Sequence, residues 1–196
     1  MAKSKTIFNS ALEPLTSSLP DDISRAIGRI VARHSYMEWI LGQVLFGLLE
    51  ISIKQGRAVV QRPAPRQYAA AVQGLYAFHK LPDKVNFTRL AEALERAEAA
   101  RDTLVNSVLM SDPGTRASPV YLVRGSWSRG SDLECISQDA WPETPVATAS
   151  YLAQLRDDVE DAVKRAEKLR DTTDTLLRKS HEQRRTNPGL NRRSGR

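Results

Sequence analysis

Hydrophobic positions recur at steps of three and four residues between about residues 21 and 55. The repeating positions are Ile23, Ile27, Ile30, His34, Met37, Leu41, Val44, Leu48 and Ile51. This spacing predicts a long helix, and apolar residues beside the stripe, such as Trp39, place that helix at the centre of a bundle. Gly42 and Gly47 lie inside it, and we attribute their presence to the close approach of a neighbouring helix.

Three more helices follow from the same period. Gly56 and two prolines interrupt the first pattern, and a second helix is predicted over about 65–80. The third runs from about 86 to 110, capped by Asn86 or Thr88. The last, over 148–179, carries a narrow apolar seam that can pack either on its own chain or on a second chain. The seam residues are Leu152, Leu155, Val159, Ala162, Ala166, Leu169, Thr173 and Leu176.

Between the third and last helices the hydrophobic period changes to two. The stretch "SPVYLVRGSW" (118–127) and the stretch "LECISQ" (133–138) flank a glycine-containing turn, which predicts a β-hairpin at about 118–138. The expected fold is therefore mainly α: a four-helix bundle with an inserted β-hairpin over 21–179. An irregular leader (1–20) precedes the bundle and a disordered basic tail (180–196) follows it.

The net charge of +6 is concentrated at one end of the chain. From Arg178 onward there are seven basic residues and one acidic residue, and the rest of the chain is balanced. A basic segment of this kind can contact phosphate without folding, or it can be a solvated end that improves solubility. The arginines of the tail that we assign to nucleic-acid contact are Arg184, Arg185, Arg192 and Arg193.

Several classes of protein are disfavoured by the composition. The single cysteine, Cys135, cannot form an internal disulfide and fits a reducing compartment. The apolar run at 39–49 is shorter than a membrane span, and residues 1–15 do not resemble a signal peptide. Three well-separated histidines form no metal-ligand pattern. We therefore expect a soluble cytoplasmic chain with no membrane partner, no metal site and no cofactor.

The stretch "EAARDTLVNSVL" (98–109) places an arginine on the apolar stripe of the third helix. Arg101 continues the spacing of the apolar positions, so its charge requires a partner. Glu38 and Glu50 of the first helix are candidates, whereas Asp102 is adjacent in sequence but lies on another face. Asn106 follows five residues after Arg101, about 140° around the helix.

An apolar long helix with a glutamate, followed by a helix with an R-x4-H pattern near its end, resembles the HEPN superfamily. The resemblance spans about 22–178, with Arg101 and Asp102 in the first two positions of the motif. It implies a helical bundle that dimerises. In active members, which are metal-independent ribonucleases, the histidine transfers protons and the arginine stabilises charge on the phosphate.

This chain has Asn106 where the motif has histidine. An amide cannot transfer protons between reactants at neutral pH. We therefore expect a non-catalytic module that binds RNA or nucleotide through Arg101, Asp102 and Asn106, as a dimer. The candidates for any residual catalysis are Arg101, Asn106, His34 and Glu38, the last two being one helical turn apart. The alternatives are a helical protein–protein interaction module, which would use the last helix and the hairpin, and a weak metal-independent ribonuclease.

Overall fold

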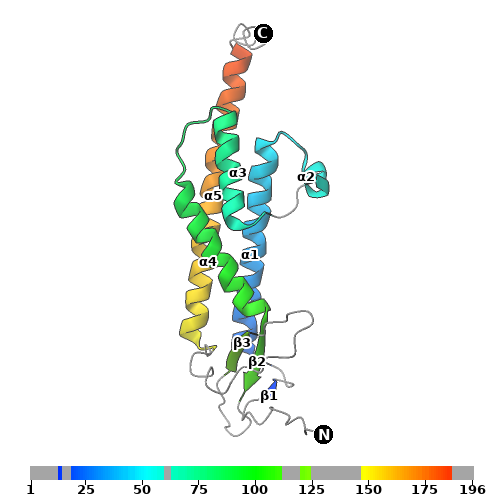
Figure 1. The fold of residues 1–196 in the computed structure, drawn as a ribbon, viewed down its shortest axis with the longest axis vertical. Coiled ribbons are helices and arrows are strands. Elements are labelled where there is room, and N and C mark those ends of the chain that lie inside the picture. Colours follow the sequence, from blue (N-terminus) through cyan, green and yellow to red (C-terminus); the bar gives the residue numbers. More distant parts are fainter. Residues whose placement is uncertain (1–12, 15–18, 60–62, 112–119, 125–146, 187–196) are drawn as a thin grey trace, which may run out of the picture. The chain divides into compact units, whose positions relative to one another are not determined.

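The structure is a computed structural model that describes residues 13–14, 19–59, 63–111, 120–124 and 147–186. These residues are mainly helical (Figure 1). The helices are α1 (Asp21–Leu48), α2 (Ile53–Val59), α3 (Pro65–Phe78), α4 (Phe87–Val105) and α5 (Ala149–Thr186). The strands are β1 (Glu13–Pro14), β2 (Ser107–Ser111) and β3 (Val120–Arg124).

The chain divides into two compact units, of which the first comprises Met1–Val31 and Ala99–Asp157. It contains the start of α1, the end of α4, the start of α5 and a three-stranded antiparallel sheet in the order β1-β2-β3. Leu109 pairs with Leu122 in the register of β2 and β3. The apolar residues buried in the helices of this unit are Ile30, Ala100, Leu104, Leu152 and Leu155.

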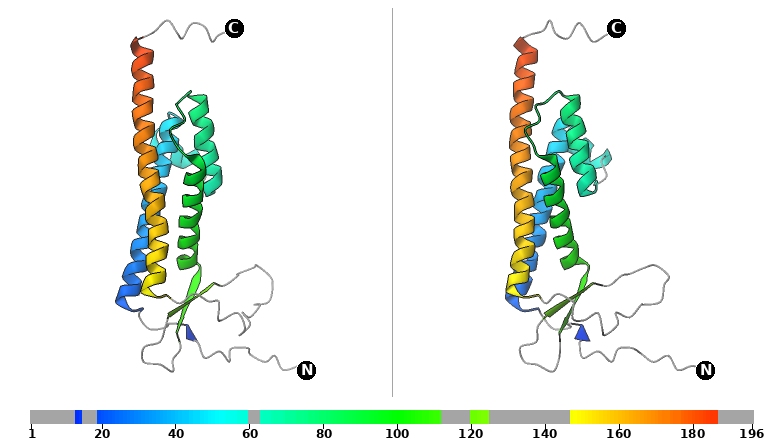
Figure 2. Two further views of the ribbon diagram at one scale, coloured as in Figure 1. Left: turned by 90° about the vertical axis from the view of Figure 1, so that its left-hand side faces the viewer. Right: turned by 60° about the vertical axis from the view of Figure 1, so that its left-hand side comes forward.

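The second unit comprises Ala32–Glu98 and Asp158–Arg196. Within it, α3 contacts three other helices (Figure 2). The Tyr68 hydroxyl donates a hydrogen bond to the Leu41 carbonyl in α1 at 2.9 Å. The Tyr76 ring meets Phe87 of α4 edge-on, with centroids 5.4 Å apart. Its hydroxyl lies 2.6 Å from that of Thr173 in α5. These contacts enclose a core that includes Ile40, Val72, Leu94 and Val163.

The first helix is shorter than the sequence predicts. It ends at Leu48 instead of Gln55, and the chain then forms α2, so the described residues contain five helices instead of four. Glu50 adopts a left-handed conformation, with φ 55°. The Glu50 amide donates to the Gly47 carbonyl and the Ile51 amide donates to the Phe46 carbonyl, which is the Schellman pattern of helix termination. Glycine normally occupies this position, so a glutamate there gave no stop signal.

The predicted hairpin at 118–138 is wrong. Strand β3 lies within its first half, but β3 pairs with β2, which precedes it in sequence. The helix predicted to reach residue 110 ends at Val105, because the apolar residues that follow enter the sheet. The proposed second strand, 133–138, lies outside the described residues. A four-helix bundle with an inserted hairpin is therefore not the fold of this chain.

The last helix is longer than predicted, and its seam is covered by its own chain. It continues to Thr186, so the predicted disorder of the tail is wrong for residues 180–186, and 187–196 lie outside the described residues. All eight predicted seam residues are buried within the single chain, which favours packing of α5 on its own chain. Thr148 caps the helix by accepting a hydrogen bond from the Tyr151 amide, and Asn86 caps α4 similarly through Arg89.

One predicted packing position is exposed. Trp39 is 45% exposed, so α1 is buried over less of its circumference than expected. A Cβ atom added to Gly47 would meet no described atom within 4 Å, and one added to Gly42 would meet only Phe46 of the same helix. The interpretation of these glycines as points of close helix approach is therefore wrong.

Candidate functional site

The Arg101–Asn106 segment lies at the end of α4. The Arg101 guanidinium donates from Nη1 to Asp102 Oδ1 at 2.6 Å, so Asp102 is its partner in place of the expected Glu38 or Glu50. The backbone amide of Asn106 closes the last helical turn by donating a hydrogen bond to the Asp102 carbonyl at 3.0 Å. The Arg101 side chain is 31% exposed and Asn106 is exposed. Because Asp102 offsets the charge of Arg101, this end of α4 attracts anions less than the sequence suggested.

The basic tail is partly incorporated into α5. Arg184 and Arg185 lie in its final turns, whereas Arg192 and Arg193 lie outside the described residues. Arg178 and Lys179 are exposed on the same helix. Among the α5 residues after Leu176 whose side chains are described, none is buried. The last turns of α5 project past the ends of α1 and α3 (Figure 2).

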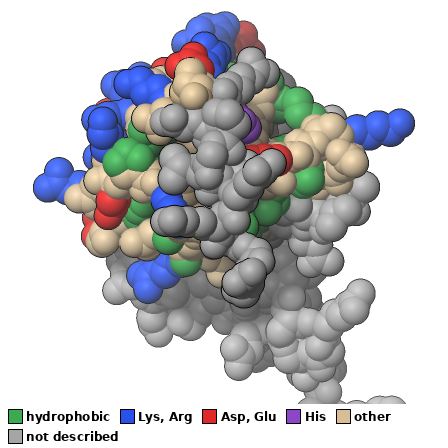
Figure 3. Space-filling model, turned by 90° about the horizontal axis from the view of Figure 1, so that it is seen from above, with side chains coloured by type: hydrophobic (Ala, Val, Ile, Leu, Met, Phe, Trp, Pro, Cys, Tyr) green, Lys and Arg blue, Asp and Glu red, His purple; other side chains and the backbone are tan. Residues whose placement is uncertain are grey.

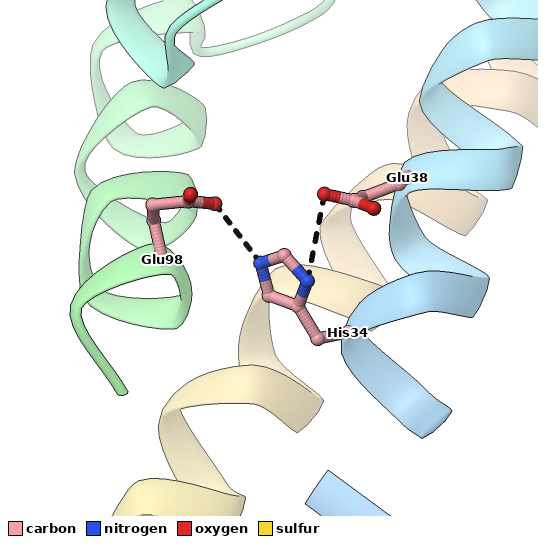
Figure 4. A group of neighbouring side chains, drawn as sticks. All are labelled: His34, Glu38 and Glu98. Atoms are coloured by element: carbon pink, nitrogen blue, oxygen red, sulfur yellow. Dashed lines mark hydrogen bonds and ion pairs between the residues drawn. The ribbon is translucent and has the colours of Figure 1, made fainter. Parts of the chain in front are cut away.

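His34 lies between two carboxylates in the second unit (Figure 4). Its Nε2 is 3.1 Å from Glu98 Oε2 and its Nδ1 is 3.5 Å from Glu38 Oε1. The imidazole is buried, and the two glutamate side chains are each about 30% exposed. His34 and Glu38 are one turn apart on α1, and Glu98 comes from α4. We call these three residues the carboxylate–histidine cluster.

The chemistry of the carboxylate–histidine cluster is that of a cation site. One imidazole nitrogen and one oxygen from each carboxylate all lie within 4.8 Å of one another. Imidazole and carboxylate together suit divalent transition metals, so this group is the described set best able to hold a metal ion.

A neighbouring ion pair fixes α1 against α5 in the same unit. Arg33 donates from Nε and Nη2 to the two carboxylate oxygens of Glu160, each at 2.7 Å. These hydrogen bonds raise the pKa of the Arg33 guanidinium. The guanidinium also lies over the Tyr36 ring, 5.2 Å from its centroid, which adds a cation–π contact. This bidentate geometry restricts movement of the turn that carries His34.

An open groove of about 600 Å³ lies along α5. Four exposed lysines line it: Lys84, from the segment before α4, and Lys164, Lys168 and Lys179 of α5. The acidic residues in the lining are Glu167 and Asp171, so the net charge is positive. We call this surface the lysine groove. The remaining lining residues are Thr172, Thr175 and Leu176.

Comparisons of this chain with models of protein families, with characterised proteins and with solved structures found no match. None of the helices in the described ranges combines the length and the apolar character needed to cross a membrane. The HEPN resemblance therefore stays a prediction made from the motif alone.

The sequence identified some members of these sites and missed others. His34 and Glu38 were candidates because they lie one turn apart, but Glu98 was not, since a single carboxylate on another helix gives no spacing signal. None of the four groove lysines was a candidate site residue. The four-residue step from Lys164 to Lys168 places both on one face, but Lys84 joins them only through the fold.

Proposed function

We propose that this chain is a non-catalytic RNA-binding module that contacts phosphates through the lysine groove and the last turns of α5. The observation that carries the proposal is the position of Lys84, Lys164, Lys168 and Lys179 around one open groove. The HEPN resemblance supports RNA as the anion. Arg101 and Asn106, at the end of α4, form a separate and smaller contact in this proposal.

The charges of the groove suit a phosphate chain. From Lys164 to Lys179 the helix rises about 22 Å, a length that accommodates several phosphates in a row. Thr175 donates its hydroxyl proton to the Asp171 carbonyl at 2.8 Å, so the lysines are the main donors to an anion. Figure 3 shows Lys and Arg side chains projecting at several points around the face seen from above, toward which the last turns of α5 extend. Because lysine acts as a mobile point charge, we expect little preference for base sequence.

The extent of α5 strengthens the proposal. The basic residues from Arg178 to Arg185 are carried on a helix instead of a disordered tail, so their backbone is ordered before RNA arrives. Preordered groups lose less conformational entropy on binding than groups on a flexible segment. We therefore assign phosphate contact to this helical part of the tail.

The absence of catalysis follows from the residue at the end of the motif. Asn106 is exposed five residues after Arg101, but its side-chain amide does not ionise near neutral pH and cannot act as a general acid or base. General acid–base catalysis contributes about 10²–10⁴-fold to rate. Without that contribution, Arg101 can orient or bind a phosphate but does not have a proton-transfer partner in the motif.

A protein-interaction function through the seam of α5 is not favoured. The seam is buried inside the chain and is therefore not available to a partner helix, and the predicted hairpin is not present as such. Self-association, which the HEPN resemblance implies, stays a prediction that sedimentation of the full chain would check.

The proposal is tested by fluorescence anisotropy of a labelled single-stranded RNA titrated with the full chain. We expect the double variant Lys164→Gln/Lys168→Gln to bind about tenfold more weakly at low salt, and to reduce the slope of log K against log salt by about 1.4. The matched control is Arg25→Gln/Lys54→Gln, which removes the same charge from exposed positions outside the groove.

The outcomes separate the possible contacts. Equal weakening by the two double variants would show that net charge alone governs binding, and would contradict the proposal. If Arg101→Ala lost RNA binding and the groove variant bound normally, the RNA-binding site would instead be at the end of α4.

A further inference from the structure

We propose that the carboxylate–histidine cluster binds a divalent transition-metal ion, for which Zn²⁺ is the appropriate probe. The ligands are His34 Nε2 and one carboxylate oxygen from each of Glu38 and Glu98. This site is separate from the lysine groove, and the proposal stands or falls independently of RNA binding.

The separation of two ligand atoms already fits a common metal. A Zn²⁺ ion lies about 2.0–2.2 Å from nitrogen or oxygen ligands. Two such ligands at tetrahedral or octahedral angles are therefore about 2.8–3.6 Å apart. The observed 3.1 Å between His34 Nε2 and Glu98 Oε2 lies in this range. The same distance also fits a hydrogen bond, so the experiment has to distinguish the two.

Glu38 supplies the third ligand from the other side of the ring (Figure 4). Its Oε1 is buried and lies 3.5 Å from His34 Nδ1, so the carboxylate has to turn toward an ion held by His34 Nε2 and Glu98. The ligand atoms of the three residues lie within 4.8 Å of one another, so a small side-chain movement closes the site. The helical i, i+4 spacing keeps His34 and Glu38 on one face throughout.

The ligand types of the cluster and the access of water to it favour a metal ion that keeps some coordination positions open. A divalent cation binds carboxylates in their ionised form and imidazole in its neutral form, as metal ligands require. Because both carboxylates are partly exposed, water can occupy the remaining positions. One imidazole and no thiolate favour Zn²⁺, Mn²⁺ or Co²⁺ over Mg²⁺ and Ca²⁺, which prefer all-oxygen sites.

The test is isothermal titration of Zn²⁺ into the untagged full chain after treatment with EDTA and dialysis. We expect one equivalent of Zn²⁺ to bind, and Glu98→Gln to weaken that binding at least tenfold. Glu98 is the first choice because its exposure makes the substitution tolerable, whereas a change at buried His34 can unfold the chain. The matched controls are Glu92→Gln, an exposed carboxylate on α4, and His181→Gln, an exposed histidine on α5; both should bind Zn²⁺ normally.

A spectroscopic readout makes the result independent of folding stability. Co²⁺ bound by one imidazole and two carboxylates should give a visible d–d band that is shifted and intensified relative to aqueous Co²⁺, and this change should be absent from folded Glu98→Gln and Glu38→Gln. Thermal unfolding should shift to higher temperature when Zn²⁺ is added to the natural chain and not when it is added to Glu98→Gln. Binding of Zn²⁺ with equal affinity to the natural chain and Glu98→Gln, or no binding to the natural chain, would overturn the proposal.

Discussion

The hydroxyl of Tyr76 lies 2.6 Å from the hydroxyl of Thr173, and both side chains are buried. Thr173 also donates to the Leu169 carbonyl at 2.7 Å, so its only hydroxyl proton is already used. Tyr76 is therefore the donor to Thr173. This chain of hydrogen bonds connects α3 to α5 within one molecule and satisfies two polar groups in an otherwise apolar interface.

Replacing Thr173 by valine should destabilise the fold through this interface. The substitution keeps the shape of the side chain but leaves the buried Tyr76 hydroxyl without its acceptor, which costs about 1–3 kcal/mol in the free energy of unfolding. Urea unfolding measures the loss. Thr175→Val is the control, because the Thr175 hydroxyl bonds to the Asp171 carbonyl on the exposed side of the same helix. A similar effect of both substitutions would show that the Tyr76–Thr173 contact contributes nothing specific.

Tyr68 should make the fold sensitive to alkaline pH. Burial raises the pKa of its hydroxyl well above the ordinary value of about 10, with a smaller contribution from Tyr76. Above that pH the unfolded chain loses the Tyr68 proton whereas the folded chain retains it. The contribution of Tyr68 to stability is therefore complete below about pH 10 and is lost as the pH rises further.

The substitution Tyr68→Phe separates the two effects of this hydroxyl. At neutral pH it should cost about 0.5–1.5 kcal/mol, because the hydrogen bond to the Leu41 carbonyl is lost. Above about pH 10 the variant should lose stability less steeply than the natural chain. Urea unfolding at a series of pH values measures both. Parallel profiles for the two proteins would contradict the assignment to Tyr68.

Two glycines of the second unit should respond oppositely to alanine. A Cβ added to Gly74, inside α3, meets no described atom within 4 Å, so Gly74→Ala should stabilise the chain by about 0.5–1 kcal/mol. A Cβ added to Gly56 of α2 would lie 2.3 Å from ring atoms of Phe46, and Gly56→Ala should cost about 1–3 kcal/mol. Thermal melts of the two variants check the opposite signs, and a shift in the same direction would refute the packing at Phe46.

The natural chain should leave RNA intact when metals are removed. Asn106 cannot carry the proton that a ribonuclease of the resembling family transfers through histidine. We expect end-labelled RNA incubated in EDTA to run at full length on a denaturing gel. Cleavage that produces cyclic phosphate ends and disappears with Arg101→Ala would instead identify the end of α4 as a working active site.

The sequence predicted those parts of the fold that follow from periodicity. The seam of α5 was confirmed residue by residue, because a repeat of three and four fixes which face is buried. The Asn86 cap was also confirmed, because Asn86 accepts a hydrogen bond from the Arg89 amide. These features depend on residues close together in the chain, whose side chains bond to backbone groups in the same turn.

The parts of the fold and of the sites that the sequence did not predict depend on backbone conformations and long-range contacts that a local pattern does not encode. The end of α1 was missed because Glu50 adopts a left-handed conformation that glycine usually signals. The partner of β3 was misassigned because strand pairing is a non-local choice, and β2 reads locally as the continuation of a helix. Glu98 and Lys84 joined their sites only through packing of separate helices.

The most direct test of the RNA-binding account is lysine acetylation of the full chain with and without saturating single-stranded RNA, quantified by mass spectrometry. RNA should protect the lysines that line the groove, which are Lys84, Lys164, Lys168 and Lys179. Lys54, exposed on α2, should be modified equally in both samples. Protection of Lys54 to the same extent as the groove lysines, or no protection in the groove while RNA is bound, would show that the lysine groove is not the RNA-binding surface.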